Sequence, residues 1–173
     1  EIRDLDNNTL GFFGSQLFPG IPGSGGHTDG FVAEVVTFLQ LTPGEHTFGI
    51  STTSERTDVN DDDSYQVYVA TNPRDFFGLK VAEYERIAPG FPTKWRNENQ
   101  FTVKAPSAGL YPFRILYWQT GRGSSLDFYT VDNATGERVL VNDPNVETAV
   151  KAFADTTVAA AKGPYVADAT PTD

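Results

Sequence analysis

The chain is built from short segments in which apolar and polar residues alternate, and turn-forming residues separate these segments. Residues 64–69 alternate one by one, whereas residues 31–41 and 110–119 are nearly continuous runs of β-branched, aromatic and aliphatic side chains. A period of two places successive side chains on opposite faces of a β-strand. About eight or nine such segments predict an all-β fold, a two-sheet antiparallel β-sandwich that is jelly-roll-like.

The alternation also predicts which residues face the core. The even-numbered residues of a strand at 46–52 share one face, and the odd-numbered residues of 64–69 point inward. A further strand is expected from Phe77 through Val81, with its odd-numbered residues on one face. The Gly-rich turn at 120–123 predicts that the strands on either side of it form a hairpin.

Near the end of the chain the pattern becomes helical. Asp143 is placed as the N-cap and Pro144 at the first helical position. An apolar stripe at helical spacing follows, made of Val146, Ala149, Val150 and Phe153. We therefore expect one short C-terminal helix of about ten residues that covers an open end of the sandwich. Residues 161–173 are poor in bulky apolar side chains, so we expect a module over 1–160 and then a linker toward a further domain.

Composition narrows the classes of partner. The formal net charge of the 173 residues is −10, because 23 Asp and Glu outnumber 13 Lys and Arg. This charge disfavours nucleic acid and anionic membrane surfaces, and it leaves cations and neutral or basic ligands open. No cysteine is present, which excludes zinc–thiolate sites, thiol nucleophiles and disulfides. No apolar run approaches the roughly 18 residues of a membrane-spanning helix, and no leader precedes Glu1, so we expect a mature protein or an excised domain.

An acidic stretch runs directly into one of the predicted strands. Residues 58–69 read DVNDDDSYQVYV, so a loop rich in carboxylate and amide oxygens leads into the alternating segment. A polar loop held by a rigid strand is a common place for a ligand. The alternative is a solvated turn in which Asp and Asn serve the backbone through Asx hydrogen bonds.

Three separated stretches that together span most of the chain resemble one family. They are Phe18-Pro19-Gly20 through Phe48-Gly49-Ile50, then Asp62-Asp63-Ser64-Tyr65, then Ala108-Gly109-Leu110-Tyr111-Pro112-Phe113-Arg114-Ile115 with Tyr117-Trp118-Gln119. Their order resembles the protective-antigen-type (fourteen-kilodalton) domain, a β-sandwich of bacterial toxins, glycosidases and yeast flocculin-like adhesins. That family pattern includes a hairpin around a Pro-Gly turn, here Pro43-Gly44. Residues 139–144 also look like modules that repeat in very large bacterial surface proteins.

The resemblance implies a calcium site in the acidic loop. In adhesin members of the family two adjacent aspartates bind Ca²⁺, which in turn holds sugar hydroxyls, and the matching positions are Asp62 and Asp63. Ca²⁺ takes six to eight oxygen ligands at roughly 2.3–2.6 Å, and Asp58, Asn60 and Asp61 supply further oxygens from the same loop. The Gly and Glu that an EF-hand loop requires are missing, so that motif is excluded.

A sugar site also needs a flat aromatic face beside polar groups. Trp95 lies in a polar segment with Arg96, and Trp118 closes an apolar strand beside Gln119. We therefore predict Trp95, Trp118, Arg96 and Gln119 as ligand-binding residues. A structural role in the core is the alternative for each tryptophan.

These observations favour a non-catalytic, lectin-like carbohydrate-binding or adhesion module of a larger secreted or bacterial surface protein. Its partners would be a glycan or polysaccharide and the flanking domains of the same polypeptide, and Ca²⁺ would be its ion. His27 and His46 each stand without a Ser or carboxylate at a recognisable motif spacing, so no motif indicates an enzyme. The alternative is a structural spacer domain of a giant surface protein that has no ligand of its own.

Overall fold

The structure is a computed structural model that describes residues 30–53, 63–71, 75–85, 96–119, 126–153 and 169–171. These residues form ten β-strands. Their bounds are β1 Phe31–Leu41, β2 Gly44–Thr53, β3 Ser64–Val69, β4 Leu79–Tyr84, β5 Arg96–Ala105, β6 Gly109–Gln119, β7 Asp127–Val131, β8 Arg138–Leu140, β9 Ala152–Phe153 and β10 Ala169–Pro171. β10 lies within the segment expected as a linker, and the domain boundary itself stays a prediction.

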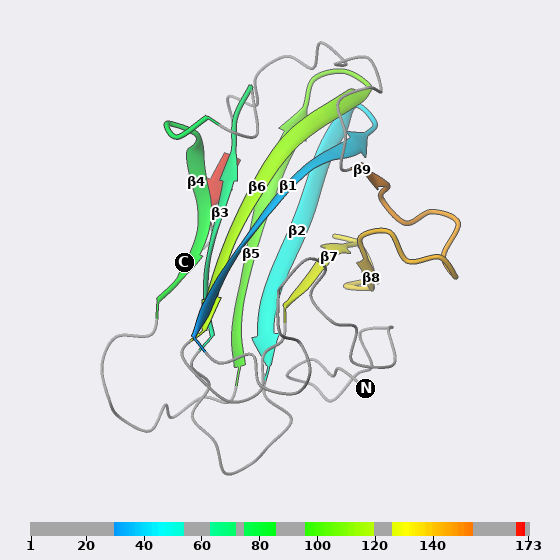
Figure 1. The fold of residues 1–173 in the computed structure, drawn as a ribbon. Coiled ribbons are helices and arrows are strands. Elements are labelled where there is room, and N and C mark those ends of the chain that lie inside the picture. Colours follow the sequence, from blue (N-terminus) through cyan, green and yellow to red (C-terminus); the bar gives the residue numbers. More distant parts are fainter. Residues whose placement is uncertain are drawn as a thin grey trace.

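The strands form two antiparallel sheets that pack face to face (Figure 1). The first sheet has the order β4-β3-β6-β1-β9, and the second has the order β10-β5-β2-β7-β8. The prediction of an all-β, two-sheet antiparallel sandwich is confirmed. Within the described residues no helix is present that has the length and apolar character to cross a membrane.

The pairing follows the winding of a jelly roll. β1 pairs with β6, β2 with β5 and β3 with β4, so that each pair is nested inside the previous one along the chain. The outermost and innermost pairs belong to the first sheet, and the middle pair belongs to the second. The chain therefore crosses between the sheets repeatedly, and its later strands extend both of them, β9 the first sheet and β7, β8 and β10 the second.

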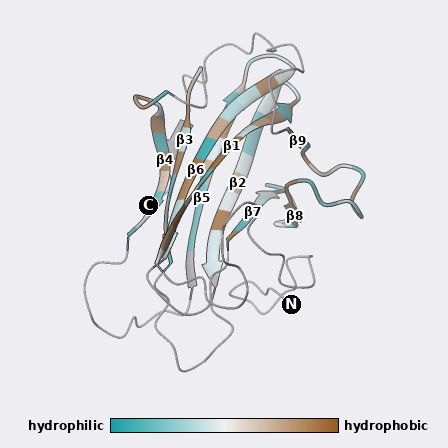
Figure 2. Ribbon diagram, in the orientation of Figure 1, coloured by the Kyte–Doolittle hydropathy of each residue, from teal (hydrophilic) through white to brown (hydrophobic). Residues whose placement is uncertain are grey.

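The core is formed by the alternate residues that the sequence pattern places inward. Phe48 and Ile50 on β2 and the three odd-numbered residues of β3 are almost fully buried, as predicted. Figure 2 shows the corresponding alternation of hydrophobic and hydrophilic bands along the strands. The buried cluster between the sheets comprises Leu39, Leu41, Phe48, Ile50, Tyr65, Val67, Val69, Val81, Ala82, Phe101, Val103, Ala105, Tyr111, Phe113 and Ile115.

Two predicted hairpins are instead connections between the sheets. The turn at Pro43-Gly44 joins β1 of the first sheet to β2 of the second, and β6 and β7 on either side of residues 120–125 also lie in different sheets. The predicted hairpin partner of β6 is therefore wrong, because β6 pairs with β1 and β3. In both cases the following strand lies in the other sheet, across the core, instead of pairing with the strand before it.

The predicted C-terminal helix is also wrong. Residues 141–150 form successive turns, with the Val146 amide donating to the Asp143 carbonyl at 3.4 Å and the Ala149 amide to the Val146 carbonyl at 3.1 Å. Asn142 closes the segment, because its side chain accepts from the Ala152 amide at 2.8 Å and donates to the Ala152 carbonyl at 3.1 Å. Asp143 does cap a turn, but its Oδ1 accepts from the Asn145 amide in an Asx turn.

Phe77 also departs from its predicted place. β4 begins only at Leu79, and Phe77 lies in the preceding turn with its side chain exposed. The Asp75 carboxylate accepts from the Phe77 amide at 2.9 Å, and the Gly78 amide donates to the Asp75 carbonyl at 3.2 Å. These bonds end the period-two pattern before Leu79, so the predicted strand starts later than expected.

Gly49 is required by close packing within the second sheet. It pairs with Tyr129 across β2 and β7, and a Cβ at position 49 would overlap the Tyr129 ring. Tyr129 cannot move aside easily, because it is fully buried and its hydroxyl donates to Glu98. The ring therefore lies directly over the glycine.

We expect Gly49→Ala to lower the free energy of unfolding by about 1–3 kcal/mol, as overpacking of a filled site does. Urea unfolding monitored by circular dichroism measures the change. The double variant Gly49→Ala/Tyr129→Ala should lose less than the sum of its two single variants, because removing the ring removes the overlap. Additive losses would contradict the explanation.

Candidate functional site

The predicted site residues that the structure describes lie at one end of the sandwich, the lower end in Figure 1. Asp63 precedes β3, Trp118 and Gln119 end β6, and Arg96 begins β5. Only residues 42 and 43 separate β1 from β2, so the first residue of β1 and the last of β2 lie at the same end. The register confirms this arrangement, since β1 begins opposite Gln119 and β2 ends opposite Arg96.

Asp63 is buried beneath this end and is held by the fold. Its side chain is 1% exposed, and its Oδ1 accepts a hydrogen bond from the Tyr117 hydroxyl at 2.6 Å. Tyr117 in turn packs against Phe31, with ring centroids 5.7 Å apart. Through this hydrogen bond, Asp63 anchors the start of β3 to the last residues of β6.

Most of the predicted metal ligands lie outside the described residues, namely Asp58, Asn60, Asp61 and Asp62. Trp95 also lies outside them, and the structure does not describe the side chains of Arg96 and Gln119. Within the described part of the chain, no three His, Cys, Asp or Glu side chains are grouped to hold a metal ion. Because that part contains only Asp63 of the five expected ligands, the calcium site stays a prediction.

Trp118 belongs to the outer face of the first sheet, the face that points away from the core. Tyr111, Phe113, Ile115 and Tyr117 of β6 are buried in the core. Arg114, Leu116 and Trp118 between and after them therefore point outward, with their register partners on β1 and β3. Trp118 is half-buried there, between Ser64 and Val32, whose side chain is 72% exposed. This outer face comprises Trp118, Leu116 and Arg114 on β6, Val32, Glu34 and Val36 on β1, Ser64, Gln66 and Tyr68 on β3, and Lys80 and Glu83 on β4.

Arg114 organises the middle of the outer face. Its Nε donates to the Glu34 carboxylate at 2.6 Å, and its guanidinium lies 5.7 Å from the Tyr68 ring centroid and 5.1 Å from that of Phe76. Phe76, from the turn before β4, is 80% exposed, whereas the Arg114 side chain is only 11% exposed. A stacked cation thus holds an exposed aromatic ring in place against the sheet.

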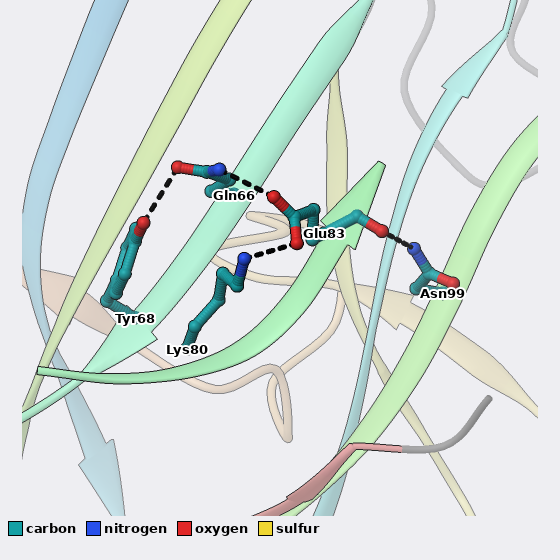
Figure 3. Close-up of polar contacts among 5 residues, drawn as sticks. All are labelled: Gln66, Tyr68, Lys80, Glu83 and Asn99. Atoms are coloured by element: carbon teal, nitrogen blue, oxygen red, sulfur yellow. Dashed lines mark hydrogen bonds and ion pairs between the residues drawn. The ribbon is translucent and has the colours of Figure 1, made fainter. Parts of the chain in front are cut away.

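A hydrogen-bonded chain continues from Tyr68 toward the sheet edge (Figure 3). The Tyr68 hydroxyl donates to Gln66 at 2.7 Å, Gln66 donates to the Glu83 carboxylate at 2.7 Å, and Lys80 forms an ion pair with the same carboxylate. The hydrogen bonds from Lys80 and Gln66 lower the pKa of Glu83, and the Glu83 bond raises the pKa of Lys80. Asn99 links this edge to the second sheet, donating to the Glu83 carbonyl at 2.8 Å.

The outer face of the second sheet carries a different polar cluster. Glu98 on β5 accepts from the Tyr129 hydroxyl and pairs with Arg138 at 3.0 Å, and the Arg138 guanidinium lies 5.2 Å from the Tyr129 ring centroid. Burial and the Glu98 contact raise the pKa of Tyr129. These groups satisfy one another, so the cluster serves to join β5, β7 and β8 through their side chains.

Asp127 lies near this cluster, on β7 of the same sheet, but no charged side chain that the structure describes pairs with it. It pairs in register with Ser51 on β2, which in turn pairs with Glu98 on β5. Among the described residues, the buried side-chain atoms without a hydrogen-bond partner are Ser51 Oγ and Asp127 Oδ2. Burial raises the pKa of Asp127 from 3.8 to about 7. A proton on this carboxyl, rather than an ion pair, therefore offsets the loss of hydration.

Sequence reasoning did not single out Arg114, Tyr68 or Phe76. Arg114 and Tyr68 lie at outward-facing positions of two predicted strands. The sequence does not show that these strands, β6 and β3, are neighbours. Their register pairs Tyr68 with Arg114. Phe76 has no motif around it in the sequence, and only the folded chain brings it over Arg114.

Comparison with protein-family models, with curated proteins and with solved structures found no match to this chain.

The raised pKa of Asp127 predicts that stability falls as pH rises. Below about pH 4 both the folded and the unfolded chain hold this proton, and between about pH 4 and 7 only the folded chain holds it. Forcing the buried group to ionise removes up to roughly 4 kcal/mol of stability by pH 8. Asp127→Asn should abolish this part of the pH dependence in urea unfolding at pH 4.5, 6 and 8.

Asp132 provides a control of opposite sign. Backbone hydrogen bonds from Thr135 and Ala134 lower its pKa, so its contribution is present at neutral pH and is lost as pH falls. Asp132→Asn should therefore differ from the parent more at pH 8 than at pH 3. A parent protein whose stability rises from pH 5 to pH 8 in step with the Asp127→Asn variant would refute the Asp127 explanation.

The calcium prediction is best tested at Asp62, because Asp63 also has a structural bond to Tyr117. If the loop binds the ion, Ca²⁺ at about 100 times its Kd should stabilise the parent by roughly 2.7 kcal/mol. For a chain of this size that corresponds to a rise in melting temperature of about 5–10 °C. Asp62→Asn should lose this rise.

Asp63→Ala serves as the comparison, since it should lower the melting temperature even with a chelator present. Equal melting temperatures of the parent with and without Ca²⁺ would exclude the loop as a calcium site.

Proposed function

We propose that this chain is a non-catalytic carbohydrate-binding module whose glycan lies on the outer face of the first sheet. The observation that carries the proposal is the combination of exposed apolar groups and fixed polar groups on the outer face of one sheet. Val32 is 72% exposed and pairs with Trp118, whereas Phe76 is 80% exposed and stacks on Arg114. Tyr68, also stacked on Arg114, begins the hydrogen-bonded chain to Glu83.

The physical chemistry of sugars fits such a surface. A pyranose ring presents apolar C–H groups on its faces, which stack on aromatic rings, and hydroxyls around its edge, which exchange hydrogen bonds with amides and carboxylates. Tyr68, Gln66 and Glu83 are already held by one another, so little side-chain entropy is lost when a ligand binds. An aromatic ring fixed by Arg114 has the same advantage.

The acidic loop supports the same end of this surface. Asp63 is followed directly by Ser64, which pairs with Trp118, so the loop joins the sheet beside the tryptophan. We include in the proposal a Ca²⁺ ion at Asp62 and its neighbours, and membership of the protective-antigen-type family, both on the strength of the sequence motifs. A secreted or cell-surface location, in a larger polypeptide, goes with that membership.

A structural spacer domain is the competing function. It would share the fold and the buried polar anchors, such as the Asp63–Tyr117 bond. What favours binding over a spacer is that the exposed Phe76 ring is fixed against the sheet by stacking on Arg114, beside the polar groups of the same face.

Affinity electrophoresis in gels that contain a panel of soluble polysaccharides tests the proposal. We expect the parent to be retarded by at least one of them, and Trp118→Ala and Phe76→Ala to weaken that binding. Each aromatic ring contributes about 0.5–1.5 kcal/mol, which corresponds to a two- to tenfold loss of affinity. Incubation with the same panel should release no reducing sugar, since the module is non-catalytic.

Phe77→Ala is the matched control. Phe77 follows Phe76 in the same turn and is 96% exposed, but the Arg114 guanidinium is stacked on Phe76. We expect Phe77→Ala to bind like the parent. Retardation by none of the polysaccharides, or equal loss in the Phe76 and Phe77 variants, would favour the spacer over the binding module.

A further inference from the structure

Among the residues that the structure describes, the two cations of the outer face are each paired with an acid of the same face. Arg114 bonds Glu34 at 2.6 Å, and Lys80 forms an ion pair with Glu83. The Lys80 pair is strengthened by Gln66, which donates to the other oxygen of the Glu83 carboxylate at 2.7 Å. The four charged residues that the structure describes on this face, Arg114, Lys80, Glu34 and Glu83, therefore sum to no net charge.

This balance matters because the rest of the chain is acidic. With a formal net charge of −10, the molecule repels polyanions unless a local excess of Lys or Arg attracts them. An anionic sugar would have to displace Glu34 from Arg114, which is stacked against two rings and 11% exposed. Specificity against a charged competitor is commonly built in this way, by leaving it no unpaired opposite charge.

Two residues of β6 define the stacking positions of this face: Trp118 itself, and Arg114, on which the Phe76 ring stacks. Trp118 and Arg114 are four residues apart on β6, so they are separated by roughly 13 Å along the strand. Leu116 lies between them on the same face, with Glu34 and Gln66 as its register partners on either side. A ligand that touches both ends must be elongated, and it meets hydrogen-bonding groups along the way.

From the paired charges and this alignment we infer that the ligand is a neutral, linear polysaccharide whose chain lies along β6, with one sugar at Trp118 and another at Phe76. This inference rests on the proposed function and specifies the class of glycan. Because Trp118 and the Phe76 ring on Arg114 lie at different points along β6, a ligand that contacts both must span several sugars.

Matched pairs of polysaccharides test the charge requirement. Hydroxyethyl cellulose and carboxymethyl cellulose share a backbone, as do dextran and dextran sulfate, and a third pair is arabinoxylan and glucuronoxylan. We expect affinity electrophoresis to show binding to the neutral member of at least one pair, at least about tenfold tighter than to its anionic partner. Equal or tighter binding to the anionic member overturns the inference and leaves the proposed function standing. Binding to no member of any pair overturns both.

Two charge variants test the cause of the preference. Glu34→Gln/Glu83→Gln leaves Arg114 and Lys80 without their acidic partners. The ratio of its affinity for the neutral polysaccharide to its affinity for the anionic one should therefore fall by roughly two- to fivefold. Glu45→Gln/Glu137→Gln changes the net charge equally at exposed positions in and beside the second sheet, and it should keep the parent's preference. Equal narrowing in both variants would show that overall charge, not pairing on this face, selects the ligand.

Oligosaccharides of increasing length, cut from the polysaccharide that binds, test the extended geometry. Inhibition of gel retardation should strengthen with length until the oligomer spans both stacking positions, and Trp118→Ala should remove the advantage of the longer oligomers. A monosaccharide that inhibits as well as the longest oligomer would overturn the arrangement along β6.

Discussion

The sandwich depends on the packing of Phe48 between its two sheets. The Phe48 ring centroid lies 5.8 Å from that of Phe101 and 5.5 Å from that of Phe128, both in the second sheet, and 5.4 Å from that of Phe113 in the first. Phe48 is fully buried on the central strand of its sheet. This contact joins β2, β5, β6 and β7, so the inner faces are held in one relative position and each sheet's outer face is presented to one side of the molecule.

The outer faces of the two sheets differ in how their polar and aromatic side chains are arranged. On the second sheet, Gly49 leaves room for the Tyr129 ring, and Glu98 and Arg138 hold that ring. The polar groups there bond to one another and so are used to stabilise the fold. On the first sheet, Arg114 is the buried member and its aromatic neighbour Phe76 remains exposed. The contacts on the second sheet contribute stability. Those on the first sheet present a rigid surface, which is why we place ligand binding on the first sheet.

Prediction from the sequence succeeded where one strand's own pattern decides the outcome. The alternation in β2 and β3 identified the buried faces, because burial on one side of a strand leaves a period of two in the residue types. It failed where a second segment decides. The Pro43-Gly44 turn has the same sequence whether it closes a hairpin or connects two sheets across the core. The apolar stripe from Val146 to Phe153 forms turns instead of a helix, and hydrogen bonds between Asn142 and Ala152 close that segment.

The sequence by itself determined an acidic, cysteine-free, all-β chain with an oxygen-rich loop ahead of one strand, since these properties depend on composition and on local periodicity. It also placed Trp118 at the end of an apolar strand, as a candidate ligand-binding residue with a structural role as the alternative. Only the tertiary structure decided that β3 and β1 flank β6, and therefore that Tyr68, Glu34 and Phe76 gather around Arg114. The reason is physical: strand neighbours in a nested sandwich are chosen by the packing of distant inner faces, and the outer face is assembled as a consequence of that choice.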